Sequence, residues 1–120
     1  MIFDTNVLIY ISKYKLDPAK ILQEKAAISV ITKIEALGYA FANNEEHNLL
    51  NAICSELEII PLTDTISEET IKLRTLHKVK LPDAIIYATA LVQGVPLLTN
   101  NIADFKSLHG NVELINPFML

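Results

Sequence analysis

Five short apolar runs restrict the folds open to this chain more than any other part of its sequence. They have the length of β-strands and little polar alternation, and they occupy residues 1–3, 26–29, 57–60, 97–99 and 112–115. Runs of this kind suit a sheet that is buried on both faces. Because longer segments with helical signatures separate them, the strands need crossover connections and pair mainly in parallel. The sequence therefore predicts an α/β fold with three layers, α/β/α, around a mostly parallel sheet of about five strands.

Local signals mark the ends of several expected helices. The pair Asp17-Pro18 combines a capping acid with a proline at the first helical position. Thr65 and Glu68 have the spacing of a capping box, which predicts a helix start there. A further helix is expected to start at Pro82 and to end at Gly94, where a glycine cap would stop it.

Composition indicates a single globular domain over residues 1–120. Hydrophobic residues make up 51% of the chain, and no repeat, low-complexity tract or Gly/Ser linker divides it. A chain of 120 residues buries about two thirds of its unfolded surface, so it needs no disulfide or structural metal to hold it together. The longest apolar stretches, residues 7–11 and 84–92, are far shorter than the roughly 20 residues that cross a bilayer.

The single cysteine and the first residues favour the cytoplasm. Cys54 has no partner for an internal disulfide, which fits a reducing compartment. Its position after Leu50 and Ile53 predicts a small core residue rather than a reactive thiol. The first residues contain no basic segment followed by an apolar one, so we expect no secretory signal.

The charge balance limits how the chain can bind nucleic acid. It has 14 acidic and 10 basic side chains, for a formal charge of -4. Phosphate binding relies on Lys and Arg displacing counterions, so net charge alone would not hold a nucleic acid. The charge balance does not exclude binding to nucleic acid through a bridging metal ion.

Acidic side chains follow the expected strands at the positions where ligands bind. In open α/β sheets the ligand site lies beyond the carboxyl ends of the strands. Asp4 directly follows the first apolar run, and Glu35 lies in the opening turns of the helix after the second. Asp83 begins the helix that leads back to the fourth run, and Asn101 and Asp104 come directly after that run. We therefore expect these side chains to meet at one edge of the sheet.

Converging carboxylates need a partner. A pair of like charges 4 Å apart repels by roughly 4 kcal/mol at an effective dielectric constant of about 20, so either the acids bind protons or a cation holds them together. Oxygen ligands favour Mg²⁺ or Mn²⁺, whereas zinc usually recruits His or Cys. The three histidines, His47, His77 and His109, lie away from the acids and show no ligand spacing. The expected ion is therefore Mg²⁺ or Mn²⁺.

Each acid also has a purely structural interpretation when it is taken alone. Residues 32–35 and 101–104 both have capping-box spacing, and Asp83 would stabilise a helix N-terminus through the helix dipole. Asp4 is harder to explain in this way, because an acid that ends a central strand is costly to bury without a partner. Glu35 fits a cap poorly, because its helix is expected to begin well before it. The combination at one sheet edge is what favours a functional site.

Four segments carry these acids. They are Asp4-Thr5-Asn6, residues 29–38 (SVITKIEALG), residues 81–90 (LPDAIIYATA) and residues 97–105 (LLTNNIADF). Together they resemble the motifs of the PIN-domain ribonucleases, and most of all the compact bacterial toxins of the VapC type. The third segment is the most specific match. The resemblance covers essentially the whole chain and implies a PIN-like domain.

The resemblance implies roles for individual residues. Asp4, Glu35 and Asp83 would bind the metal, and Asp104 would be a fourth, peripheral catalytic acid. The supporting polar groups would be Asn6, Thr99 and Asn101.

Two positions depart from the pattern that the family implies. Many relatives have Asp where this chain has Asn101, and many toxins have Arg where it has Asn100. A neutral Asn101 leaves one charge fewer to hold a second cation, so the choice between one and two metal ions stays open.

The activity that the resemblance implies is metal-dependent cleavage of RNA by the toxin of a toxin–antitoxin pair. The products would carry a 5′-phosphate and a 3′-hydroxyl, and the implied partners are RNA, an antitoxin protein and a second copy of the chain. The ligands alone indicate related chemistry, because a divalent ion held by carboxylates activates water for attack on phosphorus.

Basic and aromatic side chains suggest where such partners would bind. The basic residues concentrated just before Asp83 are candidates for guiding RNA: Lys72, Arg74, Lys78 and Lys80. A solvated helix face is the commoner reason for such a cluster. Residues 7–11, with Tyr10 and Tyr14, either pack inward or form a partner surface.

Three other classes of protein are alternatives to a nuclease. A response-regulator receiver needs two adjacent acids after its first strand, and Asp4 has no acidic neighbour. A phosphatase of the haloacid-dehalogenase type needs a second Asp where this chain has Asn6. The stronger alternative is a catalytically inactive PIN-fold module that binds RNA or protein, and only Asn101 favours it.

Overall fold

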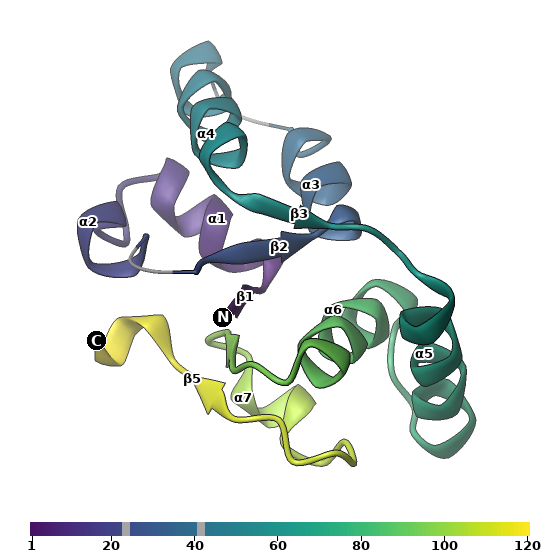
Figure 1. Cartoon of the computed structure of the whole chain (residues 1–120). Coiled ribbons are helices and arrows are strands. Elements are labelled where there is room, and N and C mark those ends of the chain that lie inside the picture. Colours follow the sequence, from purple (N-terminus) through teal and green to yellow (C-terminus); the bar gives the residue numbers. More distant parts are fainter. Residues whose placement is uncertain (23–24, 41–42) are drawn as a thin grey trace.

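The sheet has five strands and is entirely parallel, as the computed structural model of residues 1–22, 25–40 and 43–120 shows (Figure 1). The strands are β1 (Ile2–Phe3), β2 (Ala27–Ser29), β3 (Glu58–Ile60), β4 (Leu97–Leu98) and β5 (Leu114–Ile115). Their order across the sheet is β3-β2-β1-β4-β5, and each neighbouring pair is parallel. This confirms the predicted α/β class, and β1 lies at the centre.

Helices connect the strands. They are α1 (Thr5–Ser12), α2 (Pro18–Ile21), α3 (Val30–Leu37), α4 (Asn44–Glu56), α5 (Asp64–Leu76), α6 (Leu81–Gln93), α7 (Ile102–Phe105) and the final 3₁₀ turn η1 (Pro117–Met119). Within the described ranges, no helix combines the length and apolar character needed to span a membrane.

The helix ends agree with most of the sequence signals. The Asp17 carboxylate accepts a 2.9 Å hydrogen bond from the Ala19 N–H, and Gly94 ends α6 in the left-handed conformation with φ of 67°. The capping box predicted at Thr65 and Glu68 is wrong. Helix α5 begins earlier because the Thr63 hydroxyl accepts a 3.2 Å hydrogen bond from the Ile66 N–H.

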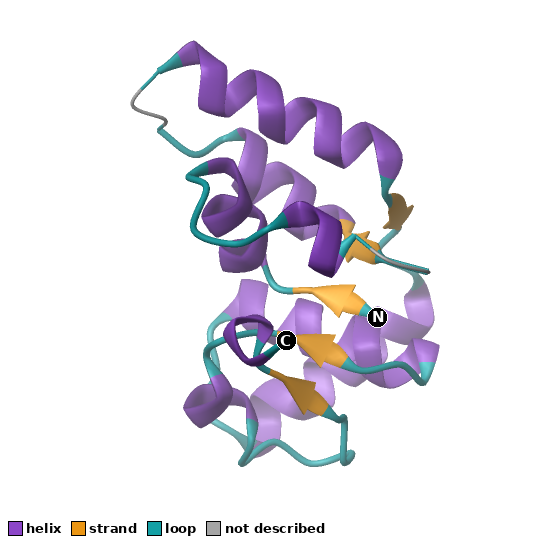
Figure 2. Cartoon of the chain, turned by 90° about the vertical axis from the view of Figure 1, so that its left-hand side faces the viewer, coloured by secondary structure: helices purple, strands orange, loops and turns teal. Residues whose placement is uncertain are grey.

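The core consists of two apolar clusters on opposite faces of the sheet. Because successive strand residues point to opposite faces, Ile2 and Leu97 join the cluster beneath α5 and α6. Phe3 and Leu98 join the cluster beneath α1, α3 and α4. Figures 1 and 2 show helices on both sides of the strands, which confirms the three-layer prediction.

Two smaller predictions concern single segments. Cys54 is buried in the cluster beneath α1 and α4, as expected for a core residue.

In α1, the side chains of residues 7, 8, 9 and 11 are buried, whereas Tyr10 is half-buried and packs edge-on against Phe118 of η1 at 5.3 Å between ring centroids. Tyr14 is 71% exposed. Residues 7–11 therefore pack mainly inward, whereas Tyr14, beyond the end of α1, faces outward.

The parallel order places the ends of the central strands beside one another. The Asp4 N–H donates a 2.9 Å hydrogen bond to the Leu98 carbonyl, so the first residues after β1 and β4 are adjacent. Figure 2 shows strand arrows that point the same way in the middle of the molecule. The loops that follow these strands therefore emerge at one edge, where the sequence places its acids.

Candidate active site

Asp4 stands at the carboxyl end of β1 and precedes the first residue of α1. It is only 4% exposed. Its Oδ2 accepts a 2.8 Å hydrogen bond from the hydroxyl of Thr99, which is fully buried after β4. The same Thr99 hydroxyl accepts a 2.9 Å hydrogen bond from the Asn101 N–H. A buried carboxylate needs such a donor, and the parallel pairing of β1 with β4 supplies it.

Glu35 lies on α3 and is half-buried. Its helix begins at Val30, where the Ser29 hydroxyl accepts a 3.2 Å hydrogen bond from the Ile31 N–H. Glu35 is therefore beyond the first turn, and the capping-box interpretation of residues 32–35 fails. Its Oε1 instead accepts a 2.8 Å hydrogen bond from the hydroxyl of Thr5, at the start of α1.

Asp83 lies in the first turn of α6 and is half-buried. Pro82 also lies in this turn, and α6 begins one residue before it, at Leu81. The residues that follow, Ala84–Ala90, are all buried, because α6 packs against α5, α3 and the sheet. This packing fixes the axis of α6, and with it the position of Asp83 at the rim of the sheet.

Asn101 and Asp104 form a pair after β4. The Asn101 side-chain amide donates a 2.9 Å hydrogen bond to Asp104 Oδ2, while Asn101 itself makes no side-chain cap for α7. The segment has capping-box spacing, but the two side chains bind each other rather than the helix backbone. Asp104 is exposed, and Asn101 is half-buried.

One pocket of about 270 Å³ brings these groups together. Its lining comes from the ends of β1 and β4 and from α1, α3, α6 and α7, and consists of Asp4, Thr5, Asn6, Glu35, Lys80, Pro82, Asp83, Asn101 and Asp104. All four predicted acids and two of the three supporting polar residues are in this list. The third, Thr99, lies behind Asp4 and contacts it directly.

The acids in the pocket affect one another's ionisation. Burial is the main reason why the pKa of Asp4 lies above its ordinary value, and the charges of Asp83 and Glu35 raise it further, against the lowering effect of the Thr99 hydrogen bond. Burial also raises the pKa of Asp83, followed by the charge of Glu35, while Lys80 opposes the rise. The pocket thus concentrates negative charge that a cation would relieve.

The donor set of the pocket suits a hard cation that keeps part of its water. Over the described residues, no three His, Cys, Asp or Glu side chains lie close enough together to ligate one ion directly. Mg²⁺ is commonly held by one or two carboxylates and several water molecules, so it does not require a closed cage of side chains. The oxygen groups of Asp4, Glu35 and Asp83, in one pocket, fit that requirement.

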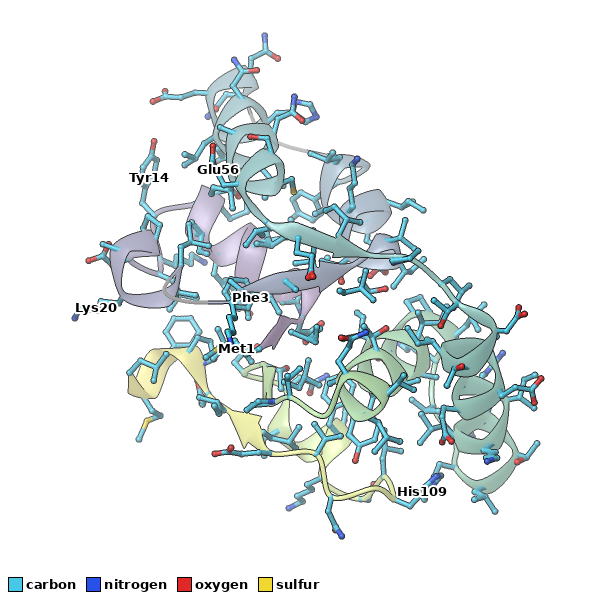
Figure 3. All side chains as sticks on the ribbon, viewed as in Figure 1. Met1, Phe3, Tyr14, Lys20, Glu56 and His109 are labelled. Carbon is cyan, nitrogen blue, oxygen red and sulfur yellow. The ribbon has the colours of Figure 1, made fainter. Side chains whose placement is uncertain are left out.

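The histidines lie elsewhere. His77 and His109 contact each other, with His77 Nε2 3.2 Å from His109 Nδ1, and neither lines the acidic pocket. Figure 3 shows His109 at the outer edge of the molecule beside α5, away from Phe3 at the centre. His47 lies on α4, which contributes nothing to the lining of the pocket.

The four predicted RNA-binding residues separate into two pairs. Lys80 lines the acidic pocket, and Lys78 lines an adjoining pocket of about 300 Å³ that also includes Lys80. Lys72 instead pairs with Glu69 at 3.4 Å on the surface of α5. Arg74 donates a 3.4 Å hydrogen bond from Nε to the Val79 carbonyl. Neither Lys72 nor Arg74 lines either pocket.

A family comparison agrees with this architecture. The family model of the PIN domain matches residues 1–110. The chain belongs to the PIN domain family. No curated protein sequence matches this PIN domain significantly.

Solved structures resemble this PIN domain over nearly its whole length. A chain of a toxin–antitoxin complex from Klebsiella pneumoniae is 34% identical, with 97% of this chain and 96% of that one covered at a TM-score of 0.73. A chain of VapBC2 from Rickettsia felis, solved with a DNA fragment from its promoter, is 26% identical, with coverages of 97% and 98% and a TM-score of 0.80. DNA-bound VapBC from Salmonella typhimurium shares the fold at 21% identity, with coverages of 97% and 96% and a TM-score of 0.82. These relatives support the resemblance to VapC-type PIN toxins.

Sequence reasoning missed two residues of this PIN domain that contact the site. Thr5 lies in the first motif but was given no role, and Thr32 was considered only as a possible cap. The structure places the Thr5 hydroxyl between the Thr32 hydroxyl and the Glu35 carboxylate. The sequence did contain a signal for both residues: Thr5 directly follows Asp4, and Thr32 lies one helical turn before Glu35. Its meaning depends on α1 packing against α3.

Proposed function

We propose that this chain is a metal-dependent endoribonuclease and the toxin of a toxin–antitoxin pair. The observation that carries the proposal is the pocket in which Asp4, Glu35, Asp83 and Asp104 come together from four separate segments of a PIN domain. PIN domains are generally nucleases, and a cluster of oxygen ligands suits the metal-assisted hydrolysis of phosphodiesters.

Asp4, Glu35 and Asp83 would hold Mg²⁺ or Mn²⁺ partly through water molecules, and Asp104 would contribute from the rim of the pocket. When bound, the ion supplies activation of water for attack on phosphorus and neutralisation of the charge that develops there. Within the protein, the Thr99 hydroxyl fixes the orientation of the Asp4 carboxylate, and the packing of α6 fixes the position of Asp83. The site thus needs no Ser, Cys or His nucleophile.

Lys80 and Lys78 would bind the RNA backbone. Among the described residues that line the acidic pocket, Lys80 alone is basic, and it also lines the adjoining pocket with Lys78. A phosphate in the acidic pocket would meet the Lys80 ammonium, and the chain of nucleotides would continue past Lys78. Phosphate contacts of this kind position a strand without reading its sequence.

The proposed protein partners are an antitoxin and a second copy of the chain. Support for the antitoxin comes from the relatives, which were solved as toxin–antitoxin complexes. Induced expression of the gene should arrest growth, and co-expression of a small neighbouring reading frame should relieve the arrest. Light scattering on the purified chain would test the homodimer.

Cleavage of a labelled single-stranded RNA tests the nuclease proposal. The wild type is incubated with Mg²⁺, with Mn²⁺ and with EDTA, beside Asp4→Asn and Asp83→Asn. Asp64→Asn is the matched control, because Asp64 is exposed on α5 outside the pocket. We expect cleavage by the wild type and the control only, and only with metal.

The outcomes separate the two functional interpretations. Equal cleavage by the wild type and both pocket variants would identify a contaminating nuclease and remove the assignment. RNA binding without cleavage by any protein, under every metal condition, would favour the inactive PIN-fold module instead. End analysis of the products, expected as 5′-phosphate and 3′-hydroxyl, identifies the bond that breaks.

A further inference from the structure

Two threonines connect α1 and α3 at the acidic pocket, where Thr5 belongs to the lining and Thr32 lies buried behind it. The Thr5 hydroxyl lies 2.8 Å from Glu35 Oε1 and 3.2 Å from the Thr32 hydroxyl. Thr32 is fully buried, and Thr5 is half-buried at the first position of α1. Thr32 and Glu35 are three residues apart on α3, so they share one face of that helix. The three side chains therefore form a continuous line from the interior to the pocket.

Proton counting fixes the direction of these contacts. An ionised carboxylate has no proton to give, so the single Thr5 proton is the one that goes to Glu35. The Thr5 oxygen then accepts the proton of the Thr32 hydroxyl. Hydrogen bonds that run in one direction polarise one another and strengthen the last bond of the chain. The Thr32 hydroxyl thus acts on the Glu35 carboxylate through Thr5.

The Glu35 carboxylate needs this restraint because its neighbours repel it. Its negative charge raises the pKa of both Asp4 and Asp83, so the Glu35 carboxylate lies close enough to feel the charges of these two acids. A Glu side chain has several rotatable bonds, and a half-buried one reaches bulk water by a change of rotamer. The Thr5 hydroxyl opposes such a movement through its 2.8 Å hydrogen bond to Glu35 Oε1.

We propose that Thr5 and Thr32 are positioning residues that hold the Glu35 carboxylate in the pocket and thereby set its affinity for a divalent cation. This inference rests on the proposed metal-dependent function. Side chains that orient a metal ligand by hydrogen bonding typically change metal affinity or activity by about 10- to 100-fold when they are removed. Thr5 contacts the carboxylate directly, so its hydroxyl has the larger effect.

Mn²⁺ binding measured by electron paramagnetic resonance tests the proposal without relying on catalysis. Thr5→Val and Thr32→Val remove each hydroxyl while keeping the shape of the side chain, and Thr5→Ser keeps the hydroxyl. Thr70→Val is the matched control, because Thr70 is a buried threonine of α5 whose hydroxyl donates to the Ile66 carbonyl. Thermal melts without metal establish that each variant is folded.

The expected result is a graded loss. Thr5→Val should bind Mn²⁺ about tenfold more weakly than the wild type, and Thr32→Val should show a smaller loss of the same kind. Thr5→Ser and Thr70→Val should bind like the wild type. In a Glu35→Gln background, Thr5→Val should cause no further loss, because the group it acts through is no longer ionised.

Two results would overturn the proposal on its own. One is a Thr5→Val variant that binds Mn²⁺ as tightly as the wild type, and the other is an equal loss in the wild-type and Glu35→Gln backgrounds. If Thr5→Val does not fold, Thr32→Val carries both comparisons. A wild type that neither binds Mn²⁺ nor cleaves RNA would instead overturn the proposed function, and this inference with it.

Discussion

The Thr99 hydroxyl donates a 2.8 Å hydrogen bond to Asp4 Oδ2 across a sequence separation of 95 residues. Both side chains are buried, and the same hydroxyl accepts a hydrogen bond from the Asn101 N–H. One hydroxyl therefore joins the ends of β1 and β4 and uses its proton and its oxygen at once. This hydroxyl therefore ties the loop that carries Asn101 to the Asp4 side chain, in addition to the backbone pairing of β1 with β4.

Removing that hydroxyl should destabilise the fold. Thr99→Val leaves a buried carboxylate oxygen and the Asn101 N–H without their donor and acceptor, so we expect a loss of about 1–3 kcal/mol in the free energy of unfolding, measured by urea titration. Thr89→Val is the control, because the Thr89 hydroxyl donates only to the Ile85 carbonyl within α6. A loss at Thr99 no greater than that at Thr89 would contradict the special role of the Asp4 contact.

Replacing Asp4 by Asn should stabilise the metal-free protein at neutral pH. Burial raises the pKa of Asp4 in the folded state above its ordinary value of 3.8, so between those two values the native state binds more protons than the unfolded state. The contribution of Asp4 to the free energy of unfolding is therefore present at low pH and is lost as the pH rises through the raised pKa. We expect the advantage of Asp4→Asn over the wild type, measured by urea unfolding in EDTA, to shrink as the pH falls towards 4.

Divalent cations should reverse that order. An ion that binds only the native state raises stability by RT ln(1 + [ion]/Kd), which is about 2.7 kcal/mol at a hundredfold excess over Kd. Thermal melts with increasing Mg²⁺ should therefore raise the Tm of the wild type and leave Asp4→Asn and Asp83→Asn nearly unchanged. Glu68→Gln, an exposed position on α5, should respond like the wild type. A uniform shift of all four proteins would indicate a non-specific salt effect.

Introducing a carboxylate at position 101 should lower the stability of the metal-free protein and strengthen its binding of a divalent cation. Asn101→Asp converts the 2.9 Å hydrogen bond to Asp104 into a contact between like charges, so we expect the metal-free protein to lose about 1 kcal/mol. The added charge should increase the rise in Tm caused by Mn²⁺. Asn51→Asp, on the exposed surface of α4, provides the comparison and should change neither quantity appreciably. An unchanged response to Mn²⁺ would place residue 101 outside the cation site.

Two lysines that are close in sequence should differ in their effect on RNA cleavage. Lys80→Met removes the basic group that lines the acidic pocket, and we expect kcat/KM to fall about tenfold, equivalent to about 1.4 kcal/mol of transition-state stabilisation. Lys72→Met should stay within about twofold of the wild type, because Lys72 pairs with Glu69 on the exposed surface of α5 and lines neither pocket. Equal losses would mean that the basic segment acts only through its total charge.

Much of the fold was predictable because hydrophobic pattern is a local property. Residues 1–3 and 26–29 have the continuous apolar character of strands covered on both faces, and the structure pairs them in parallel. The cap at Thr63 was missed for a local reason as well. Two threonines two residues apart both satisfy the pattern of a helix start, and only the backbone conformation decides which one accepts the N–H.

The site could be predicted as a set of acids but not as a network. The positions of Asp4, Glu35 and Asp83 after strands or at helix starts were enough to expect a common edge. The hydrogen-bond partners of these acids could not be predicted, because sequence spacing does not say which side chain of a neighbouring element lies within 3 Å. Lys72 and Lys80 illustrate the same limit, since both belong to one basic segment and only one of them reaches the pocket.

The amino-acid sequence alone specifies the alternation of strands and helices, the burial of the sheet on both faces and the position of the acids at its carboxyl edge. Each follows from side-chain polarity read along the chain. Packing of the whole chain is what places β1 between β2 and β4, Thr99 against Asp4 and Thr5 against Glu35. The physical reason is that hydrogen bonds are short and directional, so they depend on which strands are neighbours and on how closely the helices between them pack.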